Sequence, residues 1–556
     1  MDNRRLLLLF ALVAVLYLLW NAWENQFHPV LPPPQARAVA SRTRPASALP
    51  SLPPPPESSV ASGLPVQRTP IVRSHTGYVR VRTRVLRVRI ALRGGGLERV
   101  ALLAYRQGLS HHSPPVTLLG NHGHGWMVLT SGLEANSPSP APGSDAVYAA
   151  PFHHAHCLKG CRRLVVPLVW RGPKGLRVVK EYIFRPGGYV LRIRYIVRNG
   201  GGHNWRAAPY VVLRRAHVRH NYSFFNPRHL VYSGLGYDAR GTYHKISYDH
   251  LHHHPFEKTL RSGWITYVDN YFLATLIPPR GEPWRYFARA LRRGIYEAGV
   301  VGPILTVPAH ATDRFGLRLY LGPKLQRHLA AVAPALRQTV DYGYMTILAE
   351  PLYDLLAFIE RIVGNWGWAI VLLTLLIKAL FFPLQRMSGT SMARMRALQP
   401  RMRALQERYA EDKTRLTQAM MELYKKEKVN PASGCLPMLV QFPIYIALYW
   451  VLLFSVELRH APFILWIRDL SAPDPYYILP VLYAVTLAAY QRLVPQMTTD
   501  RLQARLMTIV VPIAVAGISL LMPAGLVVYW FVGGVFNILQ QWHINRLVGA
   551  TRARHT

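Results

Sequence analysis

Long apolar segments in the last third of the chain limit its possible fold more than any other feature. The longest, residues 506–539, has more than thirty residues, whereas one helix needs only about 20 to cross a bilayer. Because Met-Pro-Ala-Gly at 522–525 interrupts it, we expect two spans joined by a tight turn. Three more apolar segments occur at residues 366–384, 435–454 and 477–490. The sequence therefore predicts a polytopic helical membrane protein.

A further span is expected at the N-terminus. Arg4 and Arg5 precede an apolar run that ends near Trp20 and Trp23, without the Ala-x-Ala-like site of a cleaved signal peptide. Aromatic residues are enriched at membrane interfaces, so we interpret residues 1–24 as an uncleaved signal anchor. With it, six transmembrane helices are expected. The five in the C-terminal part, residues 341–556, lie at about 363–384, 434–455, 476–492, 505–521 and 525–543.

Charge in the loops predicts the orientation. Residues 385–430 contain eleven Lys or Arg against five Asp or Glu, and cytoplasmic loops are enriched in Lys and Arg. The number of spans then places both termini in the cytoplasm. It places the segment between the first two spans outside.

That outer segment has two parts. Residues 25–70 are rich in Pro, Ala and Ser, a composition typical of an extended spacer. Residues 71–340 show period-two alternation of apolar and polar residues, for example at 79–82, 86–90 and 189–197, which predicts strands. We expect a mostly β soluble domain, closed by an amphipathic helix at 325–336.

Positive charge is concentrated in the outer domain. The whole chain has 66 Lys or Arg against 27 Asp or Glu, and residues 24–345 contain 43 against 14. Since this region is expected outside the cytoplasm, nucleic acid is not an expected partner. Two interpretations remain: a solvated surface adapted to its medium, and a face that contacts lipid or substrate.

Specific motifs then follow one another along the C-terminal part. In chain order they are Gly364-Asn365-Trp366-Gly367-Trp368, Phe382-Pro383-Leu384, Leu398-Gln399-Pro400, Val429-Asn430-Pro431, Gly434-Cys435-Leu436-Pro437, Gln441-Phe442-Pro443 and Asp474-Pro475-Tyr476-Tyr477. Together they closely resemble the YidC membrane protein insertases of Gram-negative bacteria, relatives of the mitochondrial Oxa and chloroplast Albino proteins. The resemblance covers nearly the whole chain.

This resemblance implies an insertase and foldase for proteins of the inner membrane. Such a protein works on nascent membrane proteins, alone or with the Sec translocon (SecYEG and SecDF), in contact with membrane lipids. The ribosome and the signal recognition particle are further implied partners. We expect no enzyme activity and no cofactor, and the sequence has no Walker-type phosphate-binding loop.

The family's hydrophilic intramembrane groove has candidate residues here. A charge at the bilayer centre costs about 2.5 to 3.5 kcal/mol, so Lys378 needs an explanation. Thr374 lies one helical turn earlier on the same face, and Gln441 supplies an amide. The resemblance adds Tyr529 and Trp530 and places Lys378 where the family usually has Arg. In a groove the ammonium is expected to face Gln441 and Trp530; the alternative is that Lys378 snorkels to the surface.

Residues 385–430 are expected to form a cytoplasmic helical hairpin. Its apolar seam has spacings of three and four, and family resemblance implies that the hairpin recruits substrates. The seam residues singled out are Met395, Leu398, Met402, Leu405 and Met420. Residues 352–362 alternate apolar and charged positions, which predicts an interfacial amphipathic helix.

The outer domain resembles the family's periplasmic β-supersandwich, which is similar to sugar mutarotases, and we assign it no catalytic residues. Cys157 and Cys161 lie beside His153, His154 and His156. A disulfide, a metal site and free loop thiols all remain open for this pair. We assign no metal.

Two other functions compete with the insertase hypothesis. One is an intramembrane protease with a Ser/Lys pair, for which Ser519 is the best serine, although nothing in the sequence pairs it with Lys378. The other is a carbohydrate-binding domain on a membrane anchor.

Overall fold

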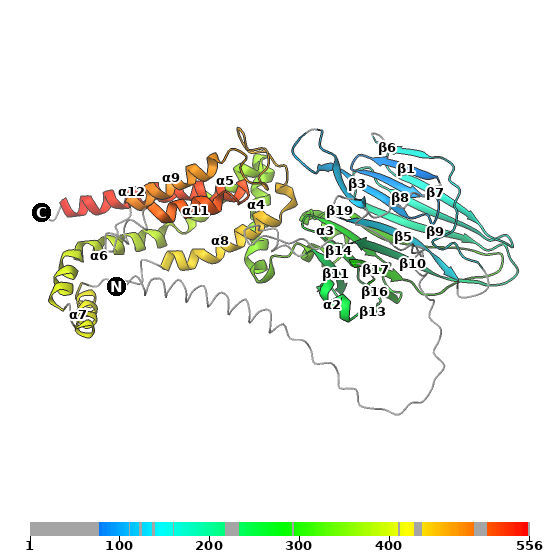
Figure 1. Cartoon of the computed structure of the whole chain (residues 1–556), viewed down its shortest axis with the longest axis horizontal. Coiled ribbons are helices and arrows are strands. Elements are labelled where there is room, and N and C mark those ends of the chain that lie inside the picture. Colours follow the sequence, from blue (N-terminus) through cyan, green and yellow to red (C-terminus); the bar gives the residue numbers. More distant parts are fainter. Residues whose placement is uncertain are drawn as a thin grey trace, which may run out of the picture. The chain divides into compact units, whose positions relative to one another are not determined.

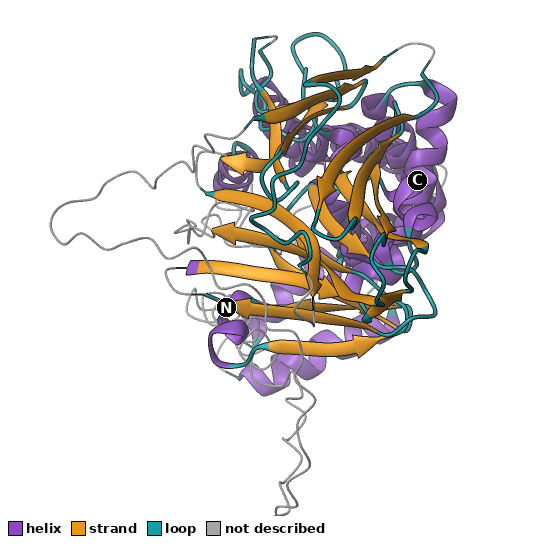
Figure 2. Ribbon diagram, turned by 90° about the vertical axis from the view of Figure 1, so that its right-hand side faces the viewer, coloured by secondary structure: helices purple, strands orange, loops and turns teal. Residues whose placement is uncertain are grey.

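The computed structural model describes residues 77–553, except 111, 122–124, 136–139, 159–160, 217–232, 292–293, 410–411, 428–435 and 494–508. The predicted signal anchor and spacer lie outside the described residues. Within the described part, strands occupy the first half and helices the second (Figures 1 and 2).

The β domain contains two sheets. An 11-stranded sheet has the order β13-β16-β17-β10-β5-β4-β3-β2-β1-β6, with β18 paired to β10, and an 8-stranded sheet has the order β12-β11-β14-β15-β19-β9-β8-β7. The strands are β1 Tyr78–Thr83, β2 Leu86–Ala91, β3 Leu97–Arg106, β4 Pro115–Asn121, β5 Trp126–Ala135, β6 His154–Cys157, β7 Leu164–Arg171, β8 Arg177–Phe184, β9 Val190–Arg198, β10 Trp205–Ala216, β11 Gly234–Ala239, β12 Thr242–Ile246, β13 Phe256–Leu260, β14 Ile265–Val268, β15 Phe272–Ile277, β16 Trp284–Ala290, β17 Ile295–Val301, β18 Leu305–Val307 and β19 Thr312–Pro323. The short helix α2, Tyr248–His253, precedes β13.

Alternation in the sequence explains which face of each sheet is buried. In β1, Val79 and Val81 are buried and Arg80 and Arg82 are exposed, as successive side chains of a strand point to opposite faces. The same pattern recurs in β2 and β9. Buried side chains from both sheets belong to one apolar core. The expected mostly β domain is therefore observed.

Helices follow the β domain. They are α3 Gln326–Val332, η3 Leu336–Thr339, η4 Gly343–Met345, α4 Thr346–Val363, α5 Trp366–Leu380, α6 Phe382–Arg408, α7 Lys413–Lys426, α8 Leu436–Phe454, η6 Val456–Leu458, α9 Ile478–Leu493, α11 Val511–Ser519 and α12 Ala524–Ala553. The expected closing helix 325–336 is thus divided into α3 and η3. The expected interfacial helix 352–362 is the second half of the longer α4.

Few described helices are long and apolar enough to span a bilayer by themselves. Ala524–Arg546 meets this test, and Trp366–Leu380 meets it together with Phe382–Gly389, across a bend of 55°. Leu439–Phe454 and Ile478–Leu493 are apolar but shorter. The expected span 363–384 is bent because α5 ends at Leu380, and Pro383 lies in the first turn of α6, where proline is tolerated. The predicted number of six spans is not established by these helices.

Apolar packing joins several helices to the end of the β domain. One buried cluster contains residues of α4, α5, α8 and α12 together with Trp264, Leu273 and Tyr320 from the β domain. Helix α5 is capped by Asn365, whose side chain accepts hydrogen bonds from the backbone N–H groups of Gly367 (2.9 Å) and Trp368 (3.1 Å). Such a cap satisfies donors that would otherwise lack partners.

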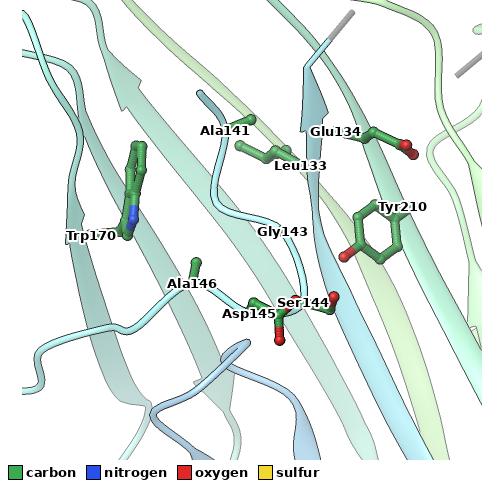
Figure 3. Close-up of a pocket in the computed structure, with 9 residues that line it drawn as sticks. All are labelled: Leu133, Glu134, Ala141, Gly143, Ser144, Asp145, Ala146, Trp170 and Tyr210. Carbon is green, nitrogen blue, oxygen red and sulfur yellow. The ribbon is translucent and has the colours of Figure 1, made fainter. Parts of the chain in front are cut away.

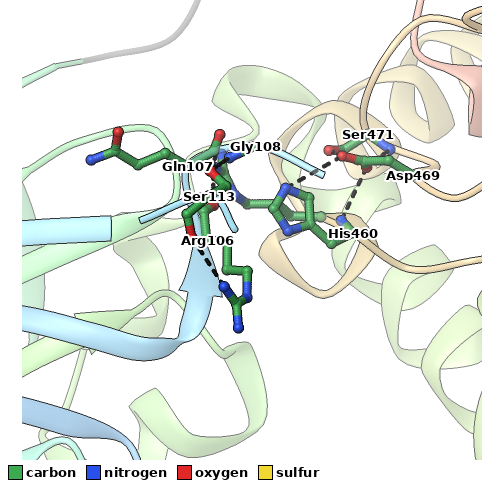
Figure 4. A network of polar contacts seen from close by, with 8 residues as sticks. Arg106, Gln107, Gly108, Ser113, His460, Asp469 and Ser471 are labelled. Carbon is green, nitrogen blue, oxygen red and sulfur yellow. Dashed lines mark hydrogen bonds and ion pairs between the residues drawn. The ribbon is translucent and has the colours of Figure 1, made fainter. Parts of the chain in front are cut away.

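Polar contacts support the loop between α8 and α9. Arg459 donates a hydrogen bond to the backbone oxygen of Arg106 on β3 (3.0 Å). Asp469 accepts hydrogen bonds from the backbone N–H groups of His460 (3.0 Å) and Ser471 (2.8 Å) and from the Ser471 hydroxyl (2.7 Å). Figure 4 shows this loop with Arg106 close by.

Glu457 links three helical segments of the same region. Its Oε1 accepts hydrogen bonds from the Tyr353 hydroxyl on α4 (2.7 Å) and the Gln326 backbone N–H on α3 (3.2 Å). Its Oε2 has no hydrogen-bond partner among the described residues. Burial is the main cause that raises the pKa of the Glu457 carboxyl above its ordinary value; the hydrogen bond from Tyr353 opposes this shift.

A pH dependence of stability follows from Glu457. Because the folded protein binds this proton more tightly than the unfolded chain, the free energy of unfolding should fall as pH rises through the raised pKa. We expect Glu457→Gln to lose this part of the pH dependence. The check is the thermal unfolding midpoint in detergent between acidic and neutral pH, for both proteins. Identical pH profiles would contradict the prediction.

Candidate functional site

Lys378 lies inside the helical core rather than at its surface. It belongs to the last turn of α5, and only 2% of its surface is exposed. Its ammonium group donates hydrogen bonds to the Tyr445 hydroxyl on α8 (3.0 Å) and to Oδ1 of Asn537 on α12 (2.9 Å). The side chain therefore does not snorkel to the surface of the bundle.

Thr374 shares the buried face of α5 with Lys378, as its spacing predicts. Its side chain is fully buried, and its hydroxyl donates to the backbone oxygen of Ile370 (2.6 Å). Gly533 on α12 faces both residues: an added Cβ there would lie 3.4 Å from Lys378 Cε and 3.9 Å from Thr374 Cγ2. The glycine allows α12 to approach α5 closely at this level.

The opposite face of α5 is apolar and exposed. Leu372 is 43% exposed and Leu376 is 50% exposed. Lipid tails are as apolar as leucine side chains, so these two exposed residues suit a surface in contact with lipid. The helix thus separates an inward polar pair from an outward leucine pair.

Gln441 and Trp530 make contacts other than the expected ones with Lys378. Gln441 on α8 is buried, and its Oε1 accepts a hydrogen bond from Gln385 Nε2 on α6 (3.2 Å). The Trp530 ring packs against the Tyr483 ring on α9, with 5.5 Å between centroids. No hydrogen bond joins Lys378 to either residue within the described part of the chain. Two of the three ammonium donors reach Tyr445 and Asn537, so the expected orientation toward Gln441 and Trp530 stays a prediction.

Tyr529 completes the polar cluster. Its ring is buried and lies 5.7 Å from the Tyr445 ring, edge to face. Its hydroxyl has no hydrogen-bond partner among the described residues, which is costly for a buried polar group. We call Lys378, Thr374, Tyr445, Tyr529 and Asn537 the lysine cluster.

Sequence reasoning missed Tyr445, Asn537 and Gln385. A signal was available for two of them. Tyr445 follows Gln441 by four residues, and Asn537 follows Tyr529 by eight, so each shares a helical face with a residue already chosen. Asn537 also interrupts an otherwise apolar run.

The expected hairpin is observed as α6 and α7. Met395 and Leu398 are buried, with Met402 on α6 and Tyr424 on α7 packed against them. Leu405 and Met420 are half-buried and are not members of this cluster. An ion pair between Arg401 and Glu427 (2.5 Å) also joins the two helices.

Two observations on the β domain address the alternatives for Cys157 and Cys161, which were a disulfide, a metal site and free thiols. Cys157 and Cys161 form a disulfide, so these thiols are not free to bind a metal. Within the described ranges, no three His, Cys, Asp or Glu residues are grouped as a metal site would need.

A pocket of about 310 Å³ lies between β5, β7 and β10. It is lined by Leu133, Glu134, Ala141, Gly143, Ser144, Asp145, Ala146, Trp170 and Tyr210 (Figure 3). Burial raises the pKa of the Glu134 carboxyl, and Asp145 forms an ion pair with Arg93 (3.2 Å). This arrangement indicates no particular reaction.

Comparison with known proteins covers both parts of the chain. The family described as 60Kd inner membrane protein matches residues 358–551, and the YidC periplasmic domain matches residues 78–355. Proteins named membrane protein insertase YidC are similar over nearly their whole length. The one from Nitrosococcus oceani is 40% identical, covering 99% of each chain, and the one from Methylococcus capsulatus is 38% identical, covering 100% of each.

Among solved structures, an active YidC insertase with its first transmembrane domain resolved is 19% identical, with a TM-score of 0.37. That match covers 84% of this chain and 92% of the other. A galactose mutarotase related enzyme from Lactobacillus acidophilus is 8% identical, with a TM-score of 0.30, over 44% of this chain and 97% of the other. On the two family matches and the full-length relatives, the chain belongs to the YidC family of membrane protein insertases.

Proposed function

We propose that this chain inserts proteins into the inner membrane and assists their folding, through a hydrophilic groove centred on Lys378. The observation that carries the proposal is the buried ammonium group among otherwise apolar helices, held by Tyr445 and Asn537. The relatives are named membrane protein insertases. No catalytic residue is needed for this activity.

The lysine cluster suits passage of a polar segment. A polar group without a partner in hydrocarbon costs several kcal/mol, so a substrate tail needs hydrogen-bonding groups along its path. Lys378 can exchange Asn537 or Tyr445 for a carboxylate of the substrate. The Tyr529 hydroxyl and Gln441 Nε2, which lack partners among the described residues, can receive further polar groups.

The family also supplies the proposed topology. We place the β domain in the periplasm, both termini in the cytoplasm and six spans in the inner membrane. Helix α4 fits the outer interface, because Ile347, Phe358 and Ile362 are exposed on it. SecYEG, SecDF, the ribosome and the signal recognition particle remain proposed partners.

Thiol accessibility tests the groove. Thr374 and Lys378 are buried in the structure, so the proposal requires that water reach them when the groove admits a substrate. In a Cys435→Ser background, cysteines at Thr374 and Lys378 should then react with a small polar thiol reagent added from the cytoplasmic side. Cysteines at Leu372 and Leu376 should be protected, since lipid covers them and the reactive thiolate does not form in hydrocarbon. Mass spectrometry of membrane vesicles measures the labelled fraction.

The pair Thr374/Lys378 and the pair Leu372/Leu376 lie on opposite faces of α5, so each pair is the control for the other. Cys157 and Cys161 do not react while their disulfide is intact. Equal protection of both faces in an active protein would rule out the groove at this position.

The hairpin has its own prediction. Leu398→Asp places a charge in the buried cluster with Met395 and should destabilise the hairpin by about 2 to 5 kcal/mol, as large core truncations do. Insertion should slow while the membrane helices remain folded. Met421→Asp, at an exposed position of α7, is the matched control. Normal insertion with a demonstrably melted hairpin would mean that the hairpin does not recruit substrates.

The protease alternative gains no support. The Ser519 hydroxyl donates to the backbone oxygen of Ala516 (2.7 Å), and the ammonium of Lys378 bonds to Tyr445 and Asn537. A serine nucleophile needs its base within hydrogen-bond reach. Retained insertion by a Ser519→Ala variant would agree with this reading.

A further inference from the structure

One outward sheet face of the β domain presents basic side chains in rows. It lies on four neighbouring strands, β6, β1, β2 and β3. Its exposed members are His154, His156, Arg80, Arg82, Arg87, Arg89 and Arg99. We call this surface the arginine face.

Strand register places like charges opposite one another. Arg82 on β1 is paired with Arg87 on β2 and with His156 on β6. Arg80 is likewise paired with Arg89. Adjacent strands are about 4.8 Å apart, and like charges directly opposite destabilise a sheet. The opposed positive charges on this face therefore do not stabilise the sheet.

Only part of this charge is compensated within the described residues. Arg89 forms an ion pair with Glu98 (2.9 Å), and the guanidinium groups of Arg80 and Arg89 lie over the Tyr78 ring, at 4.9 and 5.0 Å. No hydrogen bond or ion pair joins the side chain of Arg82 or Arg87 to any described residue. Their row is available to an external anion.

We infer that the arginine face binds an extended acidic segment of polypeptide. Residues two apart on one strand, such as Arg80 and Arg82, are separated by about 6.6 to 6.8 Å. Carboxylates at alternate positions of an extended peptide have the same spacing, so two such groups meet one strand's arginines together. Bidentate Arg–carboxylate pairs are among the stronger charge-assisted contacts.

The composition of the face favours a peptide over a lipid surface. No large apolar side chain is exposed on the described strands β1, β2, β3 and β6. Proteins that lie on membranes usually combine basic residues with apolar side chains that enter the interface. The acidic translocated tails of substrates are the natural occupants, an identification that rests on the proposed insertase function.

Peptide binding to the purified full-length protein in detergent tests the inference. The probe is a short fluorescein-labelled peptide of alternating Glu and Ser, followed by fluorescence anisotropy. Arg82→Gln/Arg87→Gln should weaken its binding by about five- to tenfold, which is about 1.0 to 1.4 kcal/mol for the two exposed contacts together. The thermal unfolding midpoint should stay the same or rise, because the variant removes repulsion.

The other sheet supplies a matched control. Arg177 on β8 faces Arg198 on β9, and both are exposed, on a face that also carries Arg171, Arg192 and Arg314. Arg177→Gln/Arg198→Gln removes the same charge from the same domain and should leave peptide affinity nearly unchanged. Equal losses in both variants would show general electrostatic attraction and overturn the site.

Two further outcomes would also overturn it. One is equal affinity for a peptide of alternating Lys and Ser. The other is displacement of the acidic peptide by phosphatidylglycerol vesicles but not by phosphatidylcholine vesicles, which would assign the face to anionic lipid. Because binding is measured without any insertion reaction, loss of the insertase proposal would leave this result unaffected.

Discussion

Lys378→Glu is expected to reduce insertion most for substrates whose translocated tails are acidic. The substitution replaces an attraction by a repulsion, and one unit-charge contact near 4 Å is worth about 4 kcal/mol at an effective dielectric constant of 20. We therefore expect at least about a tenfold decrease for an acidic tail. Substrates with neutral tails should be affected much less. Protease protection of the tail in proteoliposomes measures both.

Lys378→Arg is the matched control and should retain insertion. It keeps the positive charge and the hydrogen-bond donors of the side chain. Asn537 and Tyr445 can still accept its hydrogen bonds. An equal loss for acidic and neutral tails, with a lower unfolding midpoint, would mean that Lys378 is structural.

Deletion of residues 71–320 should separate stability from insertion. Every residue of the lysine cluster follows Asp341, so insertion should persist. Stability should fall strongly, because the deletion removes Trp264, Leu273 and Tyr320 from the core that they share with α4 and α8. The measurements are the unfolding midpoint in detergent and the insertion of a small single-span protein.

Trp264→Ala tests the packing part of that prediction within the full chain. Loss of a large buried aromatic side chain costs about 3 to 5 kcal/mol, and insertion should continue below the lowered midpoint. A stably folded deletion variant without any insertion would contradict our assignment of the activity to the helices.

Strands and helices were predicted from patterns among residues close together in the chain. The errors in these predictions were also local, at the ends of helices. Period two in residues 79–82 and 189–197 predicted strands that are observed as parts of β1 and β9. Helix ends were less predictable. The expected span 363–384 ends at Leu380, because the chain bends before Pro383, and the apolar composition continues across the bend.

The candidate site could be predicted in part. Lys378 and Thr374 were recognisable because a charge and a hydroxyl in an apolar segment are costly unless they share a polar surface. The partners of Lys378 were not recognisable, since Tyr445 and Asn537 are 67 and 159 residues away in sequence. Helix packing brings them together.

The sequence by itself determined which segments are apolar and which residues alternate. It did not assign Lys180, which lies on β8 with Val178 and Tyr182 and is fully buried there. Only the tertiary structure decided its hydrogen bonds, to the backbone oxygens of Ser131 and Gly94. The physical reason is the distance in sequence over which each kind of interaction acts. Alternation and hydropathy act between neighbours in the chain, whereas the register that opposes Arg82 to Arg87, and the packing that gives Lys378 its acceptors, depend on how separate elements fit together.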